Sequence, residues 1–124
     1  QAIIETDTDT LIAGCAKTVI PSSVKHIGNS AFVECEGLKK ILIPEGVVSI
    51  GDNAFESYFA LSSMTIPSGV TSIGASAFTK CISLSSITIP SGVTNIGNYA
   101  FQQCSGLTSI TIPSSVTTIP EAFL

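Results

Sequence analysis

Four cysteines and one histidine are the residues best suited to metal, redox or nucleophilic chemistry in this chain of 124 residues. The cysteines are Cys15, Cys35, Cys81 and Cys104, and their spacings of 20, 46 and 23 residues contain no C-x-x-C pair. Zinc sites are built from closely spaced Cys and His ligands, and the single histidine, His26, belongs to no such cluster. We therefore predict neither a metal site nor a cofactor.

Acidic residues and His26 offer the remaining routes to catalysis. Glu5, Asp7 and Asp9 alternate with threonine but lack the glycine and the terminal glutamate of an EF-hand loop. A carboxylate pair for glycoside chemistry would need the fold to bring Glu34 or Glu36 next to Glu56, and surface solvation is the favoured interpretation. His26 has no accompanying nucleophile and acid motif, so we interpret it as a solvated loop residue. No catalytic residue is predicted, and the chain is not expected to be an enzyme.

The charge balance excludes two classes of partner. Charged residues make up 11% of the chain, against about 25% in average globular proteins. Five lysines, no arginine and nine acids give a net charge of -4, and Lys80 is the only Lys, Arg, Asp or Glu in residues 57–120. Nucleic acids and anionic membranes are bound through clustered Lys and Arg, so neither is an expected partner. No apolar run is long enough to insert into a membrane, and the start carries no signal-peptide pattern.

Internal repetition organises almost the whole chain. Prolines recur every 23 residues, and Val, Ile, Gly, Ala-Phe and Leu positions keep the same step. The proline series is Pro21, Pro44, Pro67, Pro90 and Pro113. The unit reads L-x-x-I-x-I-P-x-x-V-x-x-I-G-x-x-A-F-x-x-C-x-x. Such a unit cannot bury its apolar face alone, so neighbouring units must stack.

Each part of the unit predicts a local structure. The I-x-I step, as in Ile87 and Ile89, alternates with period two and predicts a short half-buried strand that the following proline ends. Pro-Ser-Gly at 67–69 fits a type I turn with Pro second and Gly fourth. The glycine after the next isoleucine is expected to take a positive φ. The spacing in x-x-Ala-Phe-x-x-Cys suggests a single helical or 3₁₀ turn.

The predicted fold is an α/β, mostly β, solenoid. We expect a right-handed superhelix of about five 23-residue coils, with the short strands forming one continuous parallel sheet. Residues 1–124 form a single domain, in which residues 1–20 are a degenerate N-terminal repeat. Residues 113–124 are a partial C-terminal repeat or a cap, because terminal repeats deviate from the pattern. We expect a monomer or a piece of a longer repeat array.

The repeat resembles the BspA-like leucine-rich-repeat family, also called the Treponema pallidum type. The resemblance rests on Ile89-Pro90-x-x-Val93-x-x-Ile96-Gly97-x-x-Ala100-Phe101-x-x-Cys104-x-x-Leu107-x-x-Ile110, and Thr10–Pro21 looks like a variant repeat of that family. It covers about residues 10–124 and is specific for the fold. Members are typically secreted or surface-anchored bacterial proteins, and several are adhesins. The resemblance thus implies cell-surface or extracellular display and binding to a protein ligand, such as a host matrix or surface protein. It implies no catalytic residue.

Three of the cysteines share one position of the repeat. Cys35, Cys81 and Cys104 occupy it, and Tyr58 takes the slot between the first two. We interpret them as buried thiols in a column. A Cys81–Cys104 disulfide stays open, because adjacent coils place their Cα atoms about 5 Å apart.

The outward positions of the predicted strands form the candidate binding surface. In a horseshoe-shaped solenoid this face is concave and commonly binds partners. The candidate partner-binding residues are Lys40, Leu42, Ser63, Thr65, Ser86, Thr88, Ser109 and Thr111. The leading hypothesis is an adhesin-like protein-binding module. The alternatives are a structural spacer or stalk that presents another domain, and an ice- or crystal-binding surface built on the threonine column.

Overall fold

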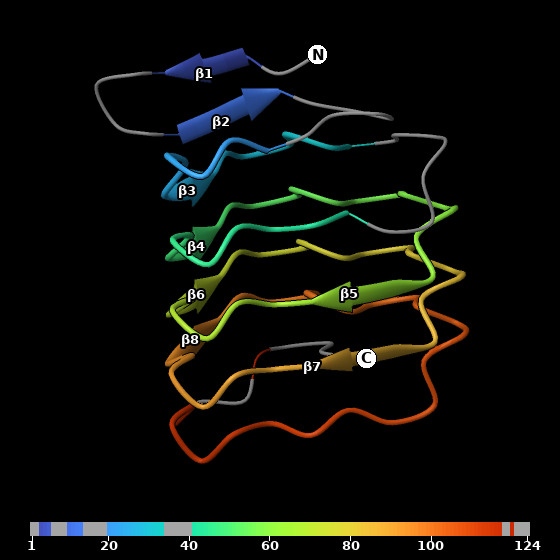
Figure 1. Ribbon diagram of the computed structural model, residues 1–124. Helices are drawn as coiled ribbons and strands as arrows, with labels where there is room; N and C mark the ends of the chain where they lie inside the picture. Colours follow the sequence, from blue (N-terminus) through green and yellow to red (C-terminus); the bar gives the residue numbers. More distant parts are fainter. Residues whose placement is uncertain (1–2, 6–9, 14–19, 34–40, 118–119, 121–124) are drawn as a thin grey trace.

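The chain winds into coils that stack along one axis, as Figure 1 shows for the computed structural model. The structure describes residues 3–5, 10–13, 20–33, 41–117 and 120. The strands are short: β1 (Ile3–Glu5), β2 (Thr10–Ala13), β3 (His26–Ile27), β4 (Ser49–Ile50), β5 (Ser63–Thr65), β6 (Ser72–Ile73), β7 (Ser86–Thr88) and β8 (Asn95–Ile96). The described residues contain no helix, so none that could cross a membrane. The predicted mostly β solenoid is confirmed.

A six-stranded sheet forms one wall of the solenoid, with the strand order β1-β2-β3-β4-β6-β8. From β3 onwards each strand pairs in parallel with its equivalent one repeat later, so that Ile27, Ile50, Ile73 and Ile96 lie side by side. At the N-terminal end β2 pairs in parallel with β3, and β1 folds back antiparallel on β2. The wall therefore begins with a hairpin, in which Leu11 takes the place of the repeating isoleucine.

A second, two-stranded sheet forms from the I-x-I segments. β5 pairs in parallel with β7 and aligns Ser63, Met64 and Thr65 with the residues 23 positions later. The repeat pattern predicts one continuous sheet from these segments, whereas the structure divides the pairing between two walls. The six-stranded wall arises from the residues before the repeating glycines, where Val-x-x-Ile has no period of two to reveal a strand. The equivalent segments at 41–43 and 110–112 are not strands.

Consecutive β-turns replace the helical turn predicted around Ala-Phe. The N–H groups of Asn53, Phe55 and Ser57 donate to carbonyl oxygens of the next coil at 2.8–2.9 Å. Because those donors point out of their own coil, they cannot close a helix. Ser57 and Asn53 also have φ values of 59° and 58°, which interrupt a right-handed helix. The same pattern of positive φ recurs at Ser30, Ser76, Lys80, Tyr99 and Gln103.

The turn after each strand is shifted by one residue from the prediction. The N–H of Val70 donates to the carbonyl oxygen of Pro67 at 3.1 Å, so proline is the first residue of the turn and Gly69 the third. Gly69 has no positive φ. A type I turn needs none at its third position, which explains why Ser23 can stand there in the first coil.

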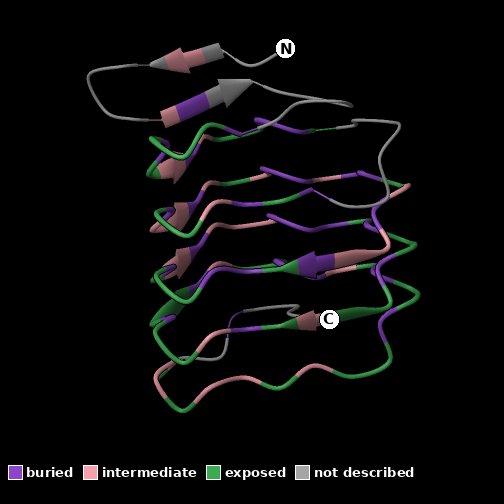
Figure 2. Cartoon of the chain, viewed as in Figure 1, coloured by how far each residue is buried: buried purple, intermediate pink, exposed green. Residues whose placement is uncertain are grey.

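The core consists of columns of identical side chains. Buried residues recur at equivalent points of successive coils, as Figure 2 shows. Phe32, Phe55, Phe78 and Phe101 are fully buried, and their rings stack nearly parallel with centroids 5.1–5.3 Å apart. This separation follows the spacing of parallel strands, about 4.8 Å, and lies in the favourable range for aromatic pairs.

Close contact between coils, and not a positive φ, explains the glycine after each isoleucine. The φ of Gly51, Gly74 and Gly97 lies outside the left-handed region, which corrects the sequence-based expectation. A Cβ built on Gly74 would lie 2.5 Å from the backbone nitrogen of Asp52 and the carbonyl carbon of Gly51. Only a hydrogen atom fits between the two backbones at this point.

Replacing Gly74 by alanine should therefore lower the free energy of unfolding by about 3 kcal/mol, the upper end of the usual cost of overpacking. Gly69→Ala is the matched control, because its Cβ would meet Glu45 and Val47 carbonyl oxygens at 3.5 and 3.6 Å, an ordinary contact. This variant should change stability by less than about 1 kcal/mol. Urea unfolding of both variants measures the difference, and equal losses would refute the steric explanation.

Candidate functional site

The outward residues of β5 and β7 lie in register on one face. Thr65 pairs with Thr88, and Ser63 pairs with Ser86. All but Ser63 of these four are exposed, and Ser63 is half-buried. Their inward neighbour Met64 is buried, so the alternation that the sequence predicted is present in β5. We call the surface formed by these four residues, together with Leu42, Ser109 and Thr111, the hydroxyl face.

The remaining predicted residues flank this pair of strands. Ser109 and Thr111 are exposed in the coil after β7, and Leu42 lies in the coil before β5. Leu42 is 87% exposed, although the equivalent positions in later coils are threonines. An apolar side chain so exposed offers a partner an anchor at one end of the face. Lys40 lies outside the described residues.

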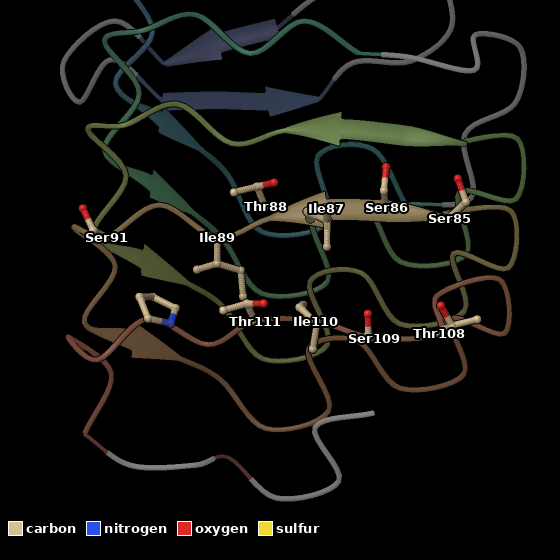
Figure 3. Close-up of a pocket in the computed structure, with 11 residues that line it drawn as sticks. Ser85, Ser86, Ile87, Thr88, Ile89, Ser91, Thr108, Ser109, Ile110 and Thr111 are labelled. Atoms are coloured by element: carbon tan, nitrogen blue, oxygen red, sulfur yellow. The ribbon is translucent and has the colours of Figure 1, made fainter.

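Grooves border the two-stranded sheet on both sides. The first has a volume of about 380 Å³ and lies between residues 85–91 and residues 108–113 (Figure 3). The second, of about 230 Å³, lies between residues 41–45 and the two β5 residues Ser63 and Thr65. A third hollow of about 190 Å³ crosses from β5 to Thr88 and Pro90. The sequence periodicity gave no sign of these grooves, because a regular repeat predicts equal spacing of all coils.

The hydroxyl face carries almost no charge. Glu45 is the only ionisable residue among those that line the three grooves. The other lining groups are serine and threonine hydroxyls, aliphatic side chains and prolines. Such a surface can form hydrogen bonds and apolar contacts but has little to attract a highly charged ligand.

His26 lies in strand β3 and not in the loop that the sequence suggested. Its side chain is half-buried, and Nδ1 lies 2.7 Å from Oγ of Ser49 in the next coil. This is the distance of a base from a nucleophile, but a catalytic triad also needs an acid that orients the imidazole. No carboxylate of the described residues forms a hydrogen bond with His26. The contact joins two coils of the six-stranded wall.

The acidic candidates do not assemble within the part of the chain that the structure describes. Glu56 accepts a hydrogen bond from Nδ2 of Asn53 in its own coil at 2.9 Å. Asp7, Asp9, Glu34 and Glu36 lie outside the described residues, and nothing is described of the Glu5 side chain. The described residues also contain no group of three or more His, Cys, Asp or Glu side chains that could hold a metal ion.

Cys81 and Cys104 are free, buried thiols on adjacent coils. Each donates a hydrogen bond to a carbonyl oxygen of the preceding coil, Cys81 to Phe55 at 3.1 Å and Cys104 to Phe78 at 3.0 Å. Burial raises the pKa of Cys81 to about 12, with a further increase from Cys104, and raises the pKa of Cys104 to about 11. They are therefore unreactive core residues in this structure, whereas Cys15 and Cys35 lie outside the described part.

Asn29 and Asp52 have a role that the repeat unit did not reveal. Oδ1 of Asn29 accepts a hydrogen bond from the Asp52 N–H, and Oδ1 of Asp52 accepts one from the Ala75 N–H, both at 2.8 Å. Each side chain thus caps the backbone of the next coil next to the crowded glycine. The signal was present in the sequence, since both residues directly follow the repeating glycine.

Comparison with known proteins agrees with this architecture. Residues 13–124 match the family described as the BspA type leucine rich repeat region, in six copies. Among curated proteins the search finds no match. The six copies exceed the approximately five coils predicted from the spacing of the prolines.

Solved leucine-rich-repeat structures are similar over most of the chain. A Treponema pallidum leucine-rich-repeat protein is 23% identical, with a TM-score of 0.67 over 91% of this chain and 68% of that one. A leucine-rich-repeat protein from Eubacterium ventriosum is 28% identical, with a TM-score of 0.67 over 90% and 40%. One from Bacteroides ovatus is 35% identical, with a TM-score of 0.60 over 78% and 31%. The chain spans less than half the length of the last two.

The buried thiols predict a specific loss of stability at alkaline pH. An unfolded thiol ionises near its ordinary pKa of 9.0, whereas Cys81 and Cys104 keep their protons to about pH 12 and 11 when folded. Between the pKa of the unfolded thiol and the higher pKa of the folded one, the folded state binds more protons than the unfolded state. The free energy of unfolding therefore falls as the pH rises through this range. From about pH 8 to about pH 10, the native chain should lose about 2 kcal/mol more than the Cys81→Ala/Cys104→Ala variant. Chemical denaturation at both pH values measures this, and equal losses would contradict the assigned burial.

Proposed function

The chain belongs to the BspA-type leucine-rich-repeat family, and from this premise we propose that it is an adhesin-like module that binds a protein ligand through its hydroxyl face. The family match over residues 13–124 makes it a leucine-rich-repeat interaction module. The single observation that supports this surface is the in-register alignment of exposed Thr65 and Thr88 beside grooves in which Glu45 is the only ionisable lining residue. We place the module outside the cell or on its surface, in keeping with the family, and a host matrix or surface protein is the proposed ligand.

The small size of the face limits the affinity of one module. Five coils spaced about 4.8 Å apart span roughly 20 Å, and a face about three strand residues wide then offers roughly 200 Å². Each partner buries about 800 Å² in a standard interface. We infer weak binding by a single module and a gain from several modules acting together. The greater length of the Eubacterium and Bacteroides proteins is consistent with longer arrays.

Two lysines on the hydroxyl face should weaken ligand binding strongly. In Thr65→Lys/Thr88→Lys, long charged side chains would stand where a partner contacts a neutral surface, and we expect at least a tenfold loss of affinity. Thr71→Lys/Thr94→Lys is the matched control, because these threonines are exposed on adjacent coils outside the hydroxyl face. Surface binding to immobilised matrix proteins measures both, with circular dichroism to check the fold. Unchanged binding by the first variant would exclude this face.

A structural spacer is the second candidate, because stacked coils with in-register ladders form a rod of fixed rise per repeat. Deleting residues 68–90 removes one complete 23-residue period and leaves the alignment of the remaining columns intact. A spacer should lose about 4.8 Å of reach and no ligand affinity. A binding module should lose affinity, since the deletion removes β7, and binding measurements on the shortened chain therefore decide between the two.

A further inference from the structure

The two walls of the solenoid differ in how completely their ladders close. In the six-stranded wall each equivalent strand pair is in register through β8, and the Gly97 N–H donates to Ile73 at 2.8 Å. On the other wall the pairing stops at β7. No backbone hydrogen bond joins residues 86–89 to residues 108–112 in the described chain. We call this unpaired junction the seam.

The groove of about 380 Å³ lies along the seam. Figure 3 shows two rows of side chains, one from β7 with Ser86 and Thr88, and one from the next coil with Ser109 and Thr111. Ile87 and Ile110 also line the groove, and both are half-buried, whereas the equivalent Met64 is only 5% exposed. The seam thus combines an apolar floor, rows of hydroxyl groups and an unpaired strand edge.

We propose that the seam binds an extended, uncharged segment of a partner polypeptide, which pairs with the free edge of β7 as an added strand. An unpaired edge presents backbone N–H and C=O groups that template another strand. The other edge of β7 shows which type of segment fits, because Ser63-Met64-Thr65 lies there in register with Ser86-Ile87-Thr88. No charged residue lines the groove, so a charged segment would lose hydration without gaining a counter-ion.

This inference deepens the proposed function, on which it rests, by naming the chemistry of the ligand. The partner segment should alternate hydroxyl-bearing and aliphatic residues, so that aliphatic side chains cover Ile87 and Ile110 while hydroxyl groups meet the rows of serine and threonine. About three residues match the length of β7, which is roughly 10 Å. A contact so short agrees with the weak binding inferred for one module.

Amide hydrogen exchange on the free chain tests whether the seam is open. Among the described residues no hydrogen-bond partner is seen for the Ser109, Ile110 and Thr111 amides, whereas the Gly74 and Gly97 amides each donate at 2.8 Å. We expect the first group to exchange at least a hundredfold faster than the second. If both groups exchange equally slowly, the seam is closed and the proposal fails.

A synthetic peptide then tests whether an extended segment binds at the seam. The peptide acetyl-Ser-Ser-Ile-Thr-Ile-Pro-Ser-amide reproduces residues 85–91 and carries no charge. Titrated into the whole chain and followed by amide NMR shifts and exchange, it should protect the amides along the seam at least tenfold. An analogue with N-methylated Ile and Thr residues keeps every side chain but cannot donate these backbone hydrogen bonds, and it should bind at least tenfold more weakly. Equal binding of the two peptides, or no binding of either, overturns the proposal.

A charge placed in the groove separates this proposal from the proposed function. Thr108→Glu introduces a carboxylate at the seam outside the hydroxyl face, and Ser114→Glu introduces one on the same coil away from the seam; both residues are exposed. Peptide binding should fall at least tenfold in the first variant and stay unchanged in the second. If the protein ligand still binds Thr108→Glu but not Thr65→Lys/Thr88→Lys, the hydroxyl face stands and the seam is refuted. If the peptide binds at the seam but none of the matrix proteins binds the chain, the seam stands and the proposed function is refuted.

Discussion

The N–H of Gly74 lies 2.8 Å from the carbonyl oxygen of Ile50, and this approach of one coil to the next constrains everything else in the molecule. Because adjacent coils are one strand spacing apart, each residue contacts the residue 23 positions away. Each side chain must therefore pack against the equivalent side chain of the next coil. Phenylalanine rings stack nearly parallel, isoleucines form continuous rows, and glycine is required where backbones touch. The repetition in the sequence is the consequence of this geometry.

The hydrogen bonds between coils differ on two parts of the circumference. Along the six-stranded wall the parallel strands exchange hydrogen bonds in both directions, and directly after each strand the later coil donates to the earlier one, as Gly74 does to Ile50. Along the turns around Ala-Phe the earlier coil donates to the later one, as Phe55 does to Ala77. Every internal coil is therefore both donor and acceptor toward each neighbour. Removing one coil's contacts on either side leaves buried N–H or C=O groups without partners, which is costly and makes the stack cooperative.

The repeat in the sequence predicted which residues share a column but not where each N–H group donates. The buried rows of Val, Ile, Phe and Leu follow directly from the spacing, and so does the outward position of Thr65 and Thr88. The turns around Ala-Phe could not be predicted in this way, because i and i+3 spacing fits a helical turn as well as two β-turns. The distinction depends on whether the Asn53 and Phe55 amides bond inside the coil or across to the next one.

The candidate surface, too, could be predicted from the sequence repeat only in part. A perfect repeat predicts that the I-x-I segments pair all along the stack, and within the described residues the structure pairs only β5 with β7. Coils that are held together on one wall and along the turns can separate on the remaining side without breaking their register. We infer that ligand binding in such a molecule arises where the stacking is incomplete, since a closed ladder leaves no backbone groups for a partner. The hydroxyl face with its grooves is a part of the described solenoid that meets that condition, and its hydroxyl-rich lining, with Glu45 as the one ionisable residue, determines which chemistry a partner must bring.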